Sequence, residues 1–192
     1  MPRIAWAGRI VADKGLPDLF EAIAALRAEG IDATLDVIGD GPDRPALEDR
    51  ARRLELDGAI RWTGYVGSRE LYLARLRAAD LFVLPSRAEG VPKVLVEAMA
   101  AGLPIVATTV GAVTGLLDAG RLGHIVPPGD VRALTDAIRR LQADPRERIR
   151  LRIAGLDFAG AHTIDAQAAH LVDWLRATFP RLPWAARGDG VA

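Results

Sequence analysis

The stretch DLFVLPSRAEGVPKVLVEAMAAGLPIVATT, residues 80–109, decides the fold of this chain. Its apolar run at 81–84 is closed by a proline and predicts a buried strand. A turn of small and polar residues follows, and Pro92 stands where its fixed φ suits the first position of a helix. Apolar residues then recur at helical spacing until Gly102, and 103–107 predicts the next strand. The stretch therefore predicts a strand, loop, helix and strand of a parallel sheet.

The rest of the chain continues this alternation. Further strands are predicted at 3–8, 34–39, 59–63 and 123–126. Further helices are predicted at 16–29, 43–56, 69–79, 112–117, 131–143 and 145–161, with a last helix capped by Thr163 or Asp165 and ending near 178. Six strands alternating with helices predict an α/β fold in which helices cover both faces of a parallel sheet.

The composition is that of an ordinary globular domain. The 192 residues are 50% hydrophobic and 26% charged, enough for one domain with a proper core. Lys and Arg number 25, as do Asp and Glu, so nothing indicates a nucleic-acid partner or a polybasic membrane contact. There is no cysteine, which excludes disulfides and thiolate metal sites. No apolar run has the length of a membrane span and no signal peptide precedes the first strand, so we expect a cytoplasmic location.

Two carboxylates flank the predicted helix start at Glu89, Gly90 and Val91. Unpaired amides at a helix start attract phosphate. Glu89 stands beside them, and Glu97 lies roughly 8 Å further along the helix. Because carboxylates accept hydrogen bonds from sugar diols, this arrangement suits a ligand with both phosphates and hydroxyls, such as a nucleotide-sugar. Two simpler interpretations stay open, namely a helical ion pair between Lys93 and Glu97 and capping of nearby amides by Glu89.

A second segment, GRIVADKG at 8–15, lies directly between a predicted strand and a predicted helix. Arg9 and Lys14 are expected at the end of that strand and the start of that helix. Two cations in this place could hold a diphosphate and neutralise its charge as it departs. The alternative is a pair of solvated charges on a loop. Lys14 and Lys93 are the only lysines in the chain, and both fall in these two segments.

The two segments together resemble the donor-binding part of the retaining glycosyltransferases of family 4, which have the two-domain GT-B architecture. Glu89 and Glu97 form an E-x7-E pair within EGVPKVLVEAMAAGLPIVAT, and GRIVADKG is similar to the family's Gly-Arg…Lys-Gly motif. The resemblance runs from residue 8 to about residue 163. It implies a Rossmann-like sheet, with Glu89 on the donor sugar, Glu97 on the ribose hydroxyls, and Arg9 and Lys14 on the diphosphate.

The resemblance also implies further contacts with the nucleotide. In Gly39-Asp40-Gly41-Pro42 the two glycines would allow close backbone approach, although a plain turn also explains them. Tyr65-Val66 would lie against the base, and the alternative is an aromatic packed at the base of a loop. The full predicted binding set is Gly8, Arg9, Lys14, Gly39, Gly41, Tyr65, Val66, Glu89, Gly90, Val91 and Glu97. The chain departs from the family at Gly111-Ala112, where Gly-Gly is usual, in a loop that borders the sugar.

No catalytic residue and no metal ligand are predicted. The family's active-site histidine belongs to the other domain, and His124, His162 and His170 share no ligand spacing. The family needs no metal, because Arg and Lys take its role. No cofactor is expected beyond the nucleoside-diphosphate sugar itself, which is the donor substrate.

The resemblance covers only the donor-binding half of such an enzyme. It implies a donor-binding domain at 1–179, a loose tail at 180–192, and an N-terminal acceptor domain that is absent from this chain. We expect 165–192 to pack on that missing half, and any membrane association to occur only through it. The isolated chain should bind donor without catalysing transfer. The full enzyme would be a retaining hexosyltransferase acting on an acceptor hydroxyl; the alternatives are half of a nucleotide-sugar epimerase and a non-catalytic nucleotide-binding module.

Overall fold

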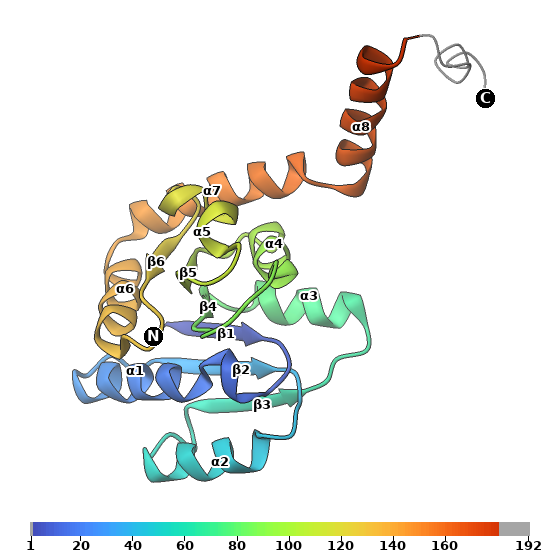
Figure 1. Cartoon of the computed structure of the whole chain (residues 1–192). Coiled ribbons are helices and arrows are strands. Elements are labelled where there is room, and N and C mark those ends of the chain that lie inside the picture. The colour runs from blue at the N-terminus through green and yellow to red at the C-terminus, as the bar shows by residue number, and fades with distance from the viewer. Residues whose placement is uncertain (1, 181–192) are drawn as a thin grey trace.

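A single parallel sheet organises the computed structural model, which describes residues 2–180 (Figure 1). Its strand order is β3-β2-β1-β4-β5-β6, and every neighbouring pair is parallel. The strands are β1 (Arg3–Ala7), β2 (Thr34–Ile38), β3 (Ile60–Gly64), β4 (Leu81–Leu84), β5 (Ile105–Thr108) and β6 (His124–Val126). This is the Rossmann-like order, so the predicted fold class is confirmed. The order reverses between β1 and β4, where such sheets bind ligands beyond their carboxyl ends.

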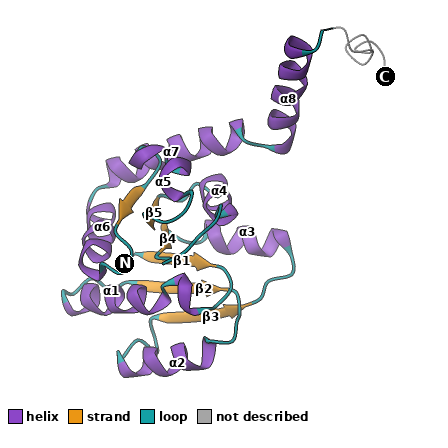
Figure 2. Cartoon of the chain, in the orientation of Figure 1, coloured by secondary structure: helices purple, strands orange, loops and turns teal. Residues whose placement is uncertain are grey.

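Helices cover both faces of the sheet, as predicted (Figure 2). One face carries α1 (Leu16–Ala28), α2 (Arg44–Arg53) and α6 (Val131–Ala143). The other carries α3 (Arg69–Arg77), α4 (Lys93–Ala100), the short α5 (Val113–Leu116) and the second half of α7 (Pro145–Ala161).

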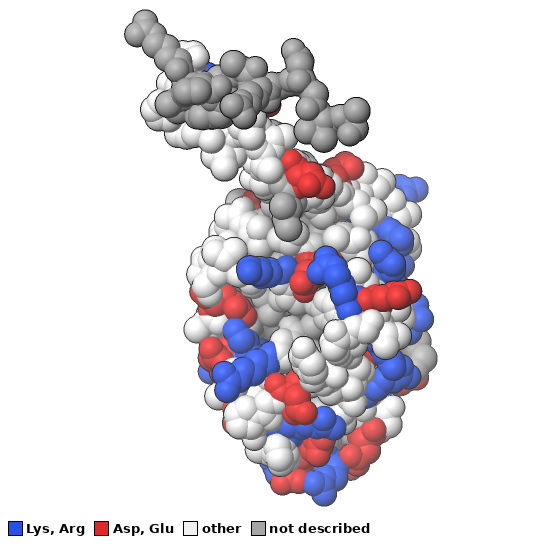
Figure 3. Space-filling model, turned by 90° about the vertical axis from the view of Figure 1, so that its right-hand side faces the viewer, with Lys and Arg blue, Asp and Glu red and all other residues white. Residues whose placement is uncertain are grey.

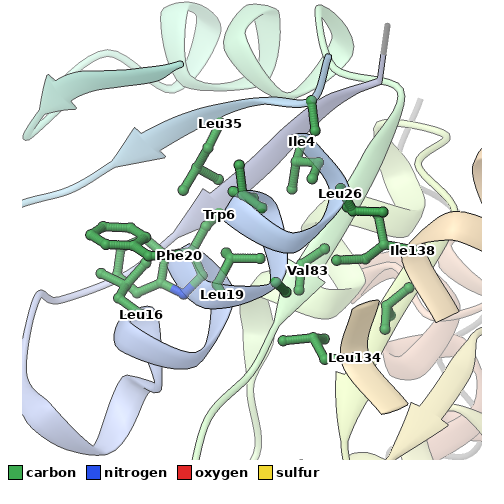
Figure 4. Packing of buried hydrophobic residues seen from close by; sticks show 14 of the residues in the cluster. Ile4, Trp6, Leu16, Leu19, Phe20, Leu26, Leu35, Val83, Leu134 and Ile138 are labelled. Atoms are coloured by element: carbon green, nitrogen blue, oxygen red, sulfur yellow. The ribbon is translucent and has the colours of Figure 1, made fainter. Parts of the chain in front are cut away.

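Each strand supplies side chains to both layers, because successive residues point to opposite faces. Ile4 and Trp6 of β1 lie in the core under α1 and α6, whereas Ala5 and Ala7 face α3 and α4. Figure 4 shows the first of these cores, where Trp6 packs among Leu16, Leu19 and Phe20 of α1. Since both faces of the central strands β1, β4 and β5 are buried, these strands are nearly continuous apolar runs.

The observed helix starts can be compared with those that the sequence predicts. Ser68, Asp130 and Thr163 each accept a hydrogen bond from the amide three residues on and so cap their helices; of the two predicted caps of the last helix, Thr163 rather than Asp165 is the one observed. Pro92 was expected at the first helical position, which is wrong by one residue. Pro92 is the extended cap residue, with ψ of 94°, and α4 begins at Lys93. The chain also forms two unpredicted single turns of 3-10 helix, η1 (Ala12–Lys14) and η2 (Asp118–Gly120).

The C-terminal part leaves the body of the domain. The last helix, α8 (Ile164–Thr178), projects away from the sheet after α7 (Figure 1). Its Trp174 is 58% exposed and packs edge to face on Phe179. The predicted loose tail lies, beyond Pro180, outside the described residues. None of the described helices combines the length and the apolar character that crossing a bilayer requires.

Candidate functional site

The predicted binding residues gather at the carboxyl edge of the sheet. The strands β1, β2 and β3 point to this edge in Figure 1, and Figure 3 looks directly at it. There, charged side chains of both signs surround a hollow. The loops that follow β1 and β4 meet at this edge, at the point where the strand order reverses.

Backbone contacts hold the loop after β1 against the loop after β4. Gly15 has a φ of +66°, and a Cβ at this position would overlap the carbonyl oxygen of Pro85. The amide of Arg87 donates to the carbonyl of Asp13 at 2.7 Å, which ties the two loops a second time. Only a glycine allows this approach, because it combines a left-handed backbone with the absence of a side chain.

This approach brings Lys14 and Glu89 into direct contact. Lys14 Nζ lies 2.9 Å from Glu89 Oε1, and the two side chains are only 21% and 10% exposed. The hydroxyl of Ser86 donates to the same carboxylate oxygen at 2.7 Å. Ser86 is itself fixed, because its carbonyl accepts the hydroxyl of Thr108 at the end of β5. A lysine from one loop thus pairs with an acid from the other, and both belong to the predicted binding set.

Glu97 is oriented by α3. Tyr72 donates its hydroxyl to Glu97 Oε2 at 2.8 Å. Burial, and then the hydrogen bond to Glu97, raise the pKa of Tyr72 above its usual range. Tyr72 therefore stays protonated and remains a donor to this carboxylate. This contact takes the place of the helical ion pair with Lys93 that the spacing alone allowed.

Arg9 lines a hollow next to these groups. The hollow has a volume of about 390 Å³ and its lining includes Arg9, Gly39, Tyr65 and Tyr72. Arg9 is exposed on the loop after β1. Because Tyr72 both lines this hollow and binds Glu97, Arg9 and Glu97 border the same part of the edge, although no bond joins them.

The glycines and Tyr65 have a clear structural setting. A Cβ on Gly39 would overlap the carbonyl oxygen of Gly8, and one on Gly41 would overlap that of Ile10, so the loops after β1 and β2 pack backbone against backbone. Tyr65 is 84% exposed and so is not packed at the base of its loop, whereas Val66 contacts the core under α3 and α4.

The start of α4 is open to solvent on one side. Gly90 is exposed and Val91 is 71% exposed, which leaves this helix start accessible. The loop after β5 closes its other side, because a Cβ on Gly111 would overlap the carbonyl oxygen of Glu89 and the amide of Ala112 donates to Gly90 at 3.0 Å. In the described part of the chain, no group of three or more His, Asp and Glu side chains is placed to hold a metal ion.

Three residues of this edge were missed from the sequence. Ser86 carries a weak signal, since it is a polar residue three positions before Glu89. Tyr72 carries none, because its partner Glu97 is 25 residues away on another helix. Asp18 of α1 was also missed; both of its carboxylate oxygens lie 2.9 Å from Arg87 Nη2, a further link between the first helix and the loop after β4.

Comparison with known proteins identifies the family of the chain. The model of the family described as glycosyl transferases group 1 matches residues 1–144. The chain belongs to this family. Among curated relatives, the alpha-D-kanosaminyltransferase of Streptomyces kanamyceticus is 37% identical over 150 residues, which are 78% of this chain and 39% of that protein. The chain thus spans well under half the length of that relative.

Two solved structures share the fold. The C-terminal domain of the group 1 glycosyltransferase LpcC from Francisella tularensis superposes with a TM-score of 0.75 at 26% identity, covering 84% of this chain and 85% of that one. HepE from Anabaena, solved in complex with UDP, gives a TM-score of 0.77 at 23% identity, covering 90% of this group 1 chain and 49% of HepE. The predicted resemblance to the C-terminal half of a glycosyltransferase is thereby confirmed.

Proposed function

We propose that this chain binds a nucleoside-diphosphate sugar at the carboxyl edge of its sheet, as the donor-binding domain of a retaining hexosyltransferase. The observation that carries the proposal is the contact between Lys14 and Glu89, because it places a cation and an acid from two distant loops at the point where the strand order reverses. The presence of UDP in HepE, which has the same fold, supports a nucleotide as the ligand.

In this proposal Arg9 and Lys14 hold the diphosphate. One of the three N–H groups of Lys14 donates to Glu89, and the other two can donate to phosphate oxygens. Arg9 is exposed and lines the adjoining hollow. Gly90 and Val91, which are exposed just before α4, leave the positive end of this helix open on the same side.

The two carboxylates would bind hydroxyls, Glu89 on the sugar and Glu97 on the ribose. Each already has one oxygen fixed by the protein, Glu89 Oε1 by Lys14 and Ser86 and Glu97 Oε2 by Tyr72. The second oxygen of each has no hydrogen bond within residues 2–180 and can accept one from a diol. Tyr65, exposed at the rim of the hollow, would lie against the base.

The reaction proposed for the whole enzyme breaks the bond between the sugar and the diphosphate, and the sugar moves to an acceptor hydroxyl with retention. The departing diphosphate gains negative charge, which Arg9 and Lys14 stabilise without a metal ion. The acceptor would be bound by a second domain that is not part of this chain, and a cytoplasmic location stays a prediction. We assign no catalytic residue to the chain itself.

Calorimetry with UDP, GDP and ADP tests the proposal directly. Glu97→Ala should weaken binding of the preferred nucleotide about tenfold or more, because a charge-assisted hydrogen bond to the ribose is lost. Glu70→Ala, which removes an exposed acid from α3, is the control for the change in net charge. Saturating ligand, at about a hundred times its dissociation constant, should add roughly 2.7 kcal/mol to the free energy of unfolding. If none of the three nucleotides binds, or if both variants bind like the wild type, the assignment of this site is wrong.

A further inference from the structure

The helix α7 has apolar residues on its outward face as well as on its inward face. Its inward residues Leu151 and Ala159 lie in the two cores. On the opposite side, Ile149, Ile153 and Leu156 are 59%, 56% and 41% exposed. Their spacing of four and three residues places them on one side of the helix, where they form a continuous apolar ridge. Single exposed apolar residues need no explanation, but a ridge of three along a helix does.

Two hollows flank this ridge, and arginines line both of them. The first, of about 500 Å³, is bordered by α7, by the ends of α3 and α4 and by the beginning of β5. Its charged lining residues are Arg77, Asp80, Arg148 and Arg152. The second, of about 530 Å³, lies on the other side of α7, and its charged lining residues are Arg121, Arg150 and Asp157. Five arginines and two aspartates therefore flank the ridge of a chain whose net charge is zero.

The positive charge that nearby acids leave unneutralised lies at the first hollow, because Arg121 and Arg150 of the second hollow are paired with Asp118 and Glu147. Asp80 is already paired with Arg3, and Arg148 Nη1 donates to the carbonyls of Leu141 and Gln142. Within residues 2–180, no carboxylate lies within 4.0 Å of a side-chain nitrogen of Arg77 or Arg152, nor of Arg146 at the exposed start of the helix.

We propose that this face, defined by the ridge and the arginine-lined first hollow beside it, docks on the surface of an anionic lipid bilayer. A helix with an apolar side and flanking cations lies in the interface between headgroups and acyl chains. Arginine suits this position, because its guanidinium binds lipid phosphate while its stem lies along apolar surface. The ridge would enter the interface, and the first hollow would take lipid phosphates.

The charges disfavour a second copy of this chain as the occupant. In a symmetric dimer the same face meets itself, so the arginines on the two copies would be brought together. The convex shape disfavours an acidic protein, because such a partner would need a groove for the ridge and a projection for each hollow. A bilayer surface adapts to both.

The proposed surface is independent of the donor site. The first hollow is lined by Asp80 and Pro104, which precede β4 and β5, whereas the donor site lies beyond the carboxyl ends of the strands. The proposal also differs from the expectation that any membrane contact belongs to the missing half. It needs no spanning helix, since α7 would lie along the surface.

Flotation with lipid vesicles tests this docking on the whole chain. Vesicles of phosphatidylcholine and phosphatidylglycerol in equal parts should bind the wild type, and vesicles of phosphatidylcholine alone should not. The pair Ile149→Gln with Ile153→Gln should abolish binding. The pair Arg146→Gln with Arg152→Gln should weaken it about thirtyfold and reduce its salt dependence.

Matched controls distinguish this face from general charge or stickiness. Arg53→Gln with Arg61→Gln removes two exposed charges from another face, and Leu71→Gln removes a side chain that is 62% exposed on α3. Both should bind vesicles like the wild type, and thermal unfolding should confirm that every variant is folded. Equal binding to both kinds of vesicle, full binding by the ridge variants, or the absence of binding by the wild type would overturn the proposal. So would light scattering that shows a dimer abolished by the ridge variants.

Discussion

Replacing Gly15 by alanine should damage both the stability of the fold and the proposed donor site. The new Cβ would overlap the carbonyl oxygen of Pro85, which belongs to the backbone and cannot turn aside as a flexible side chain would. The left-handed backbone, with φ of +66°, adds about 1–2 kcal/mol for any residue with a Cβ. The forced separation of the loops adds about 1–3 kcal/mol, as for overpacking in a core. The expected loss is about 2–5 kcal/mol.

Gly30→Ala is the matched control. Gly30 also has a left-handed backbone, with φ of +82°, but no atom lies within 4 Å of the position that its Cβ would take. Only the conformational cost should appear, about 1–2 kcal/mol. Urea unfolding of the two variants measures both losses, and the difference between them isolates the contact with Pro85.

Nucleotide binding separates this effect on the site from a general loss of stability. Gly15 directly follows Lys14, and Pro85 directly precedes Ser86, so the clash moves apart the two loops that form the contact of 2.9 Å between Lys14 and Glu89. Calorimetry with the preferred nucleotide should show an affinity at least about tenfold lower for Gly15→Ala and an unchanged one for Gly30→Ala. Equal destabilisation by the two changes would refute the packing argument. An unchanged affinity in a destabilised Gly15→Ala would refute the positioning argument.

Other perturbations test the contacts around this edge. Lys14→Met and Glu89→Gln should each cost about 1–3 kcal/mol in urea unfolding, whereas the double variant should lose less than the sum, because the pair is coupled; strict additivity would contradict this. Tyr72→Phe should cost about 1 kcal/mol in the same measurement by leaving its carboxylate partner without a donor, and a neutral result would mean that water replaces the hydroxyl. The hydrogen bond from Arg150, and to a lesser extent the one with His124, lowers the pKa of Glu147 to about 2. Glu147 therefore stabilises the folded state above its unfolded pKa, and this stabilisation is lost as pH falls towards 2. Glu147→Gln should therefore cost about 1 kcal/mol at pH 7 after solvent screening, and its difference from the wild type should shrink below about pH 4; a constant difference would exclude this explanation.

The alternation of strands and helices could be predicted because its signals are local. The most buried strands are short apolar runs, and several helix starts have a side-chain cap, such as Ser68 or Asp130. The error at Pro92 has a local cause too, since proline fixes its φ but leaves its ψ free, and an extended ψ makes it the cap instead of the first helical residue.

Contacts within the site divide according to whether topology alone predicts them. Lys14 and Glu89 lie 75 residues apart, yet both follow strands whose carboxyl ends meet at one edge, so their neighbourhood could be expected. The hydrogen-bond partner of Glu97 could not be predicted from topology. The spacing allows an ion pair with Lys93 on the same helix, whereas in the structure Glu97 accepts a hydrogen bond from Tyr72 of α3. Which partner forms depends on how α3 lies against α4. Periodicity predicts which side of a helix is buried but not which helix covers it.

Backbone contacts between loops set the shape of the site, whereas exposed side chains at its rim are expected to set which donor it selects. At Gly15, Gly39 and Gly111 the place of a Cβ is filled by a carbonyl oxygen of the neighbouring loop, so close backbone contacts fit together the four loops beyond β1, β2, β4 and β5. The side chains that differ most freely in such an arrangement are those that touch nothing in the fold, and Tyr65 and Val91 are 84% and 71% exposed at the rim. A change at either should therefore alter which base or sugar is accepted while leaving the loops in place. Changes at the three glycines should move the loops themselves and impair every donor alike.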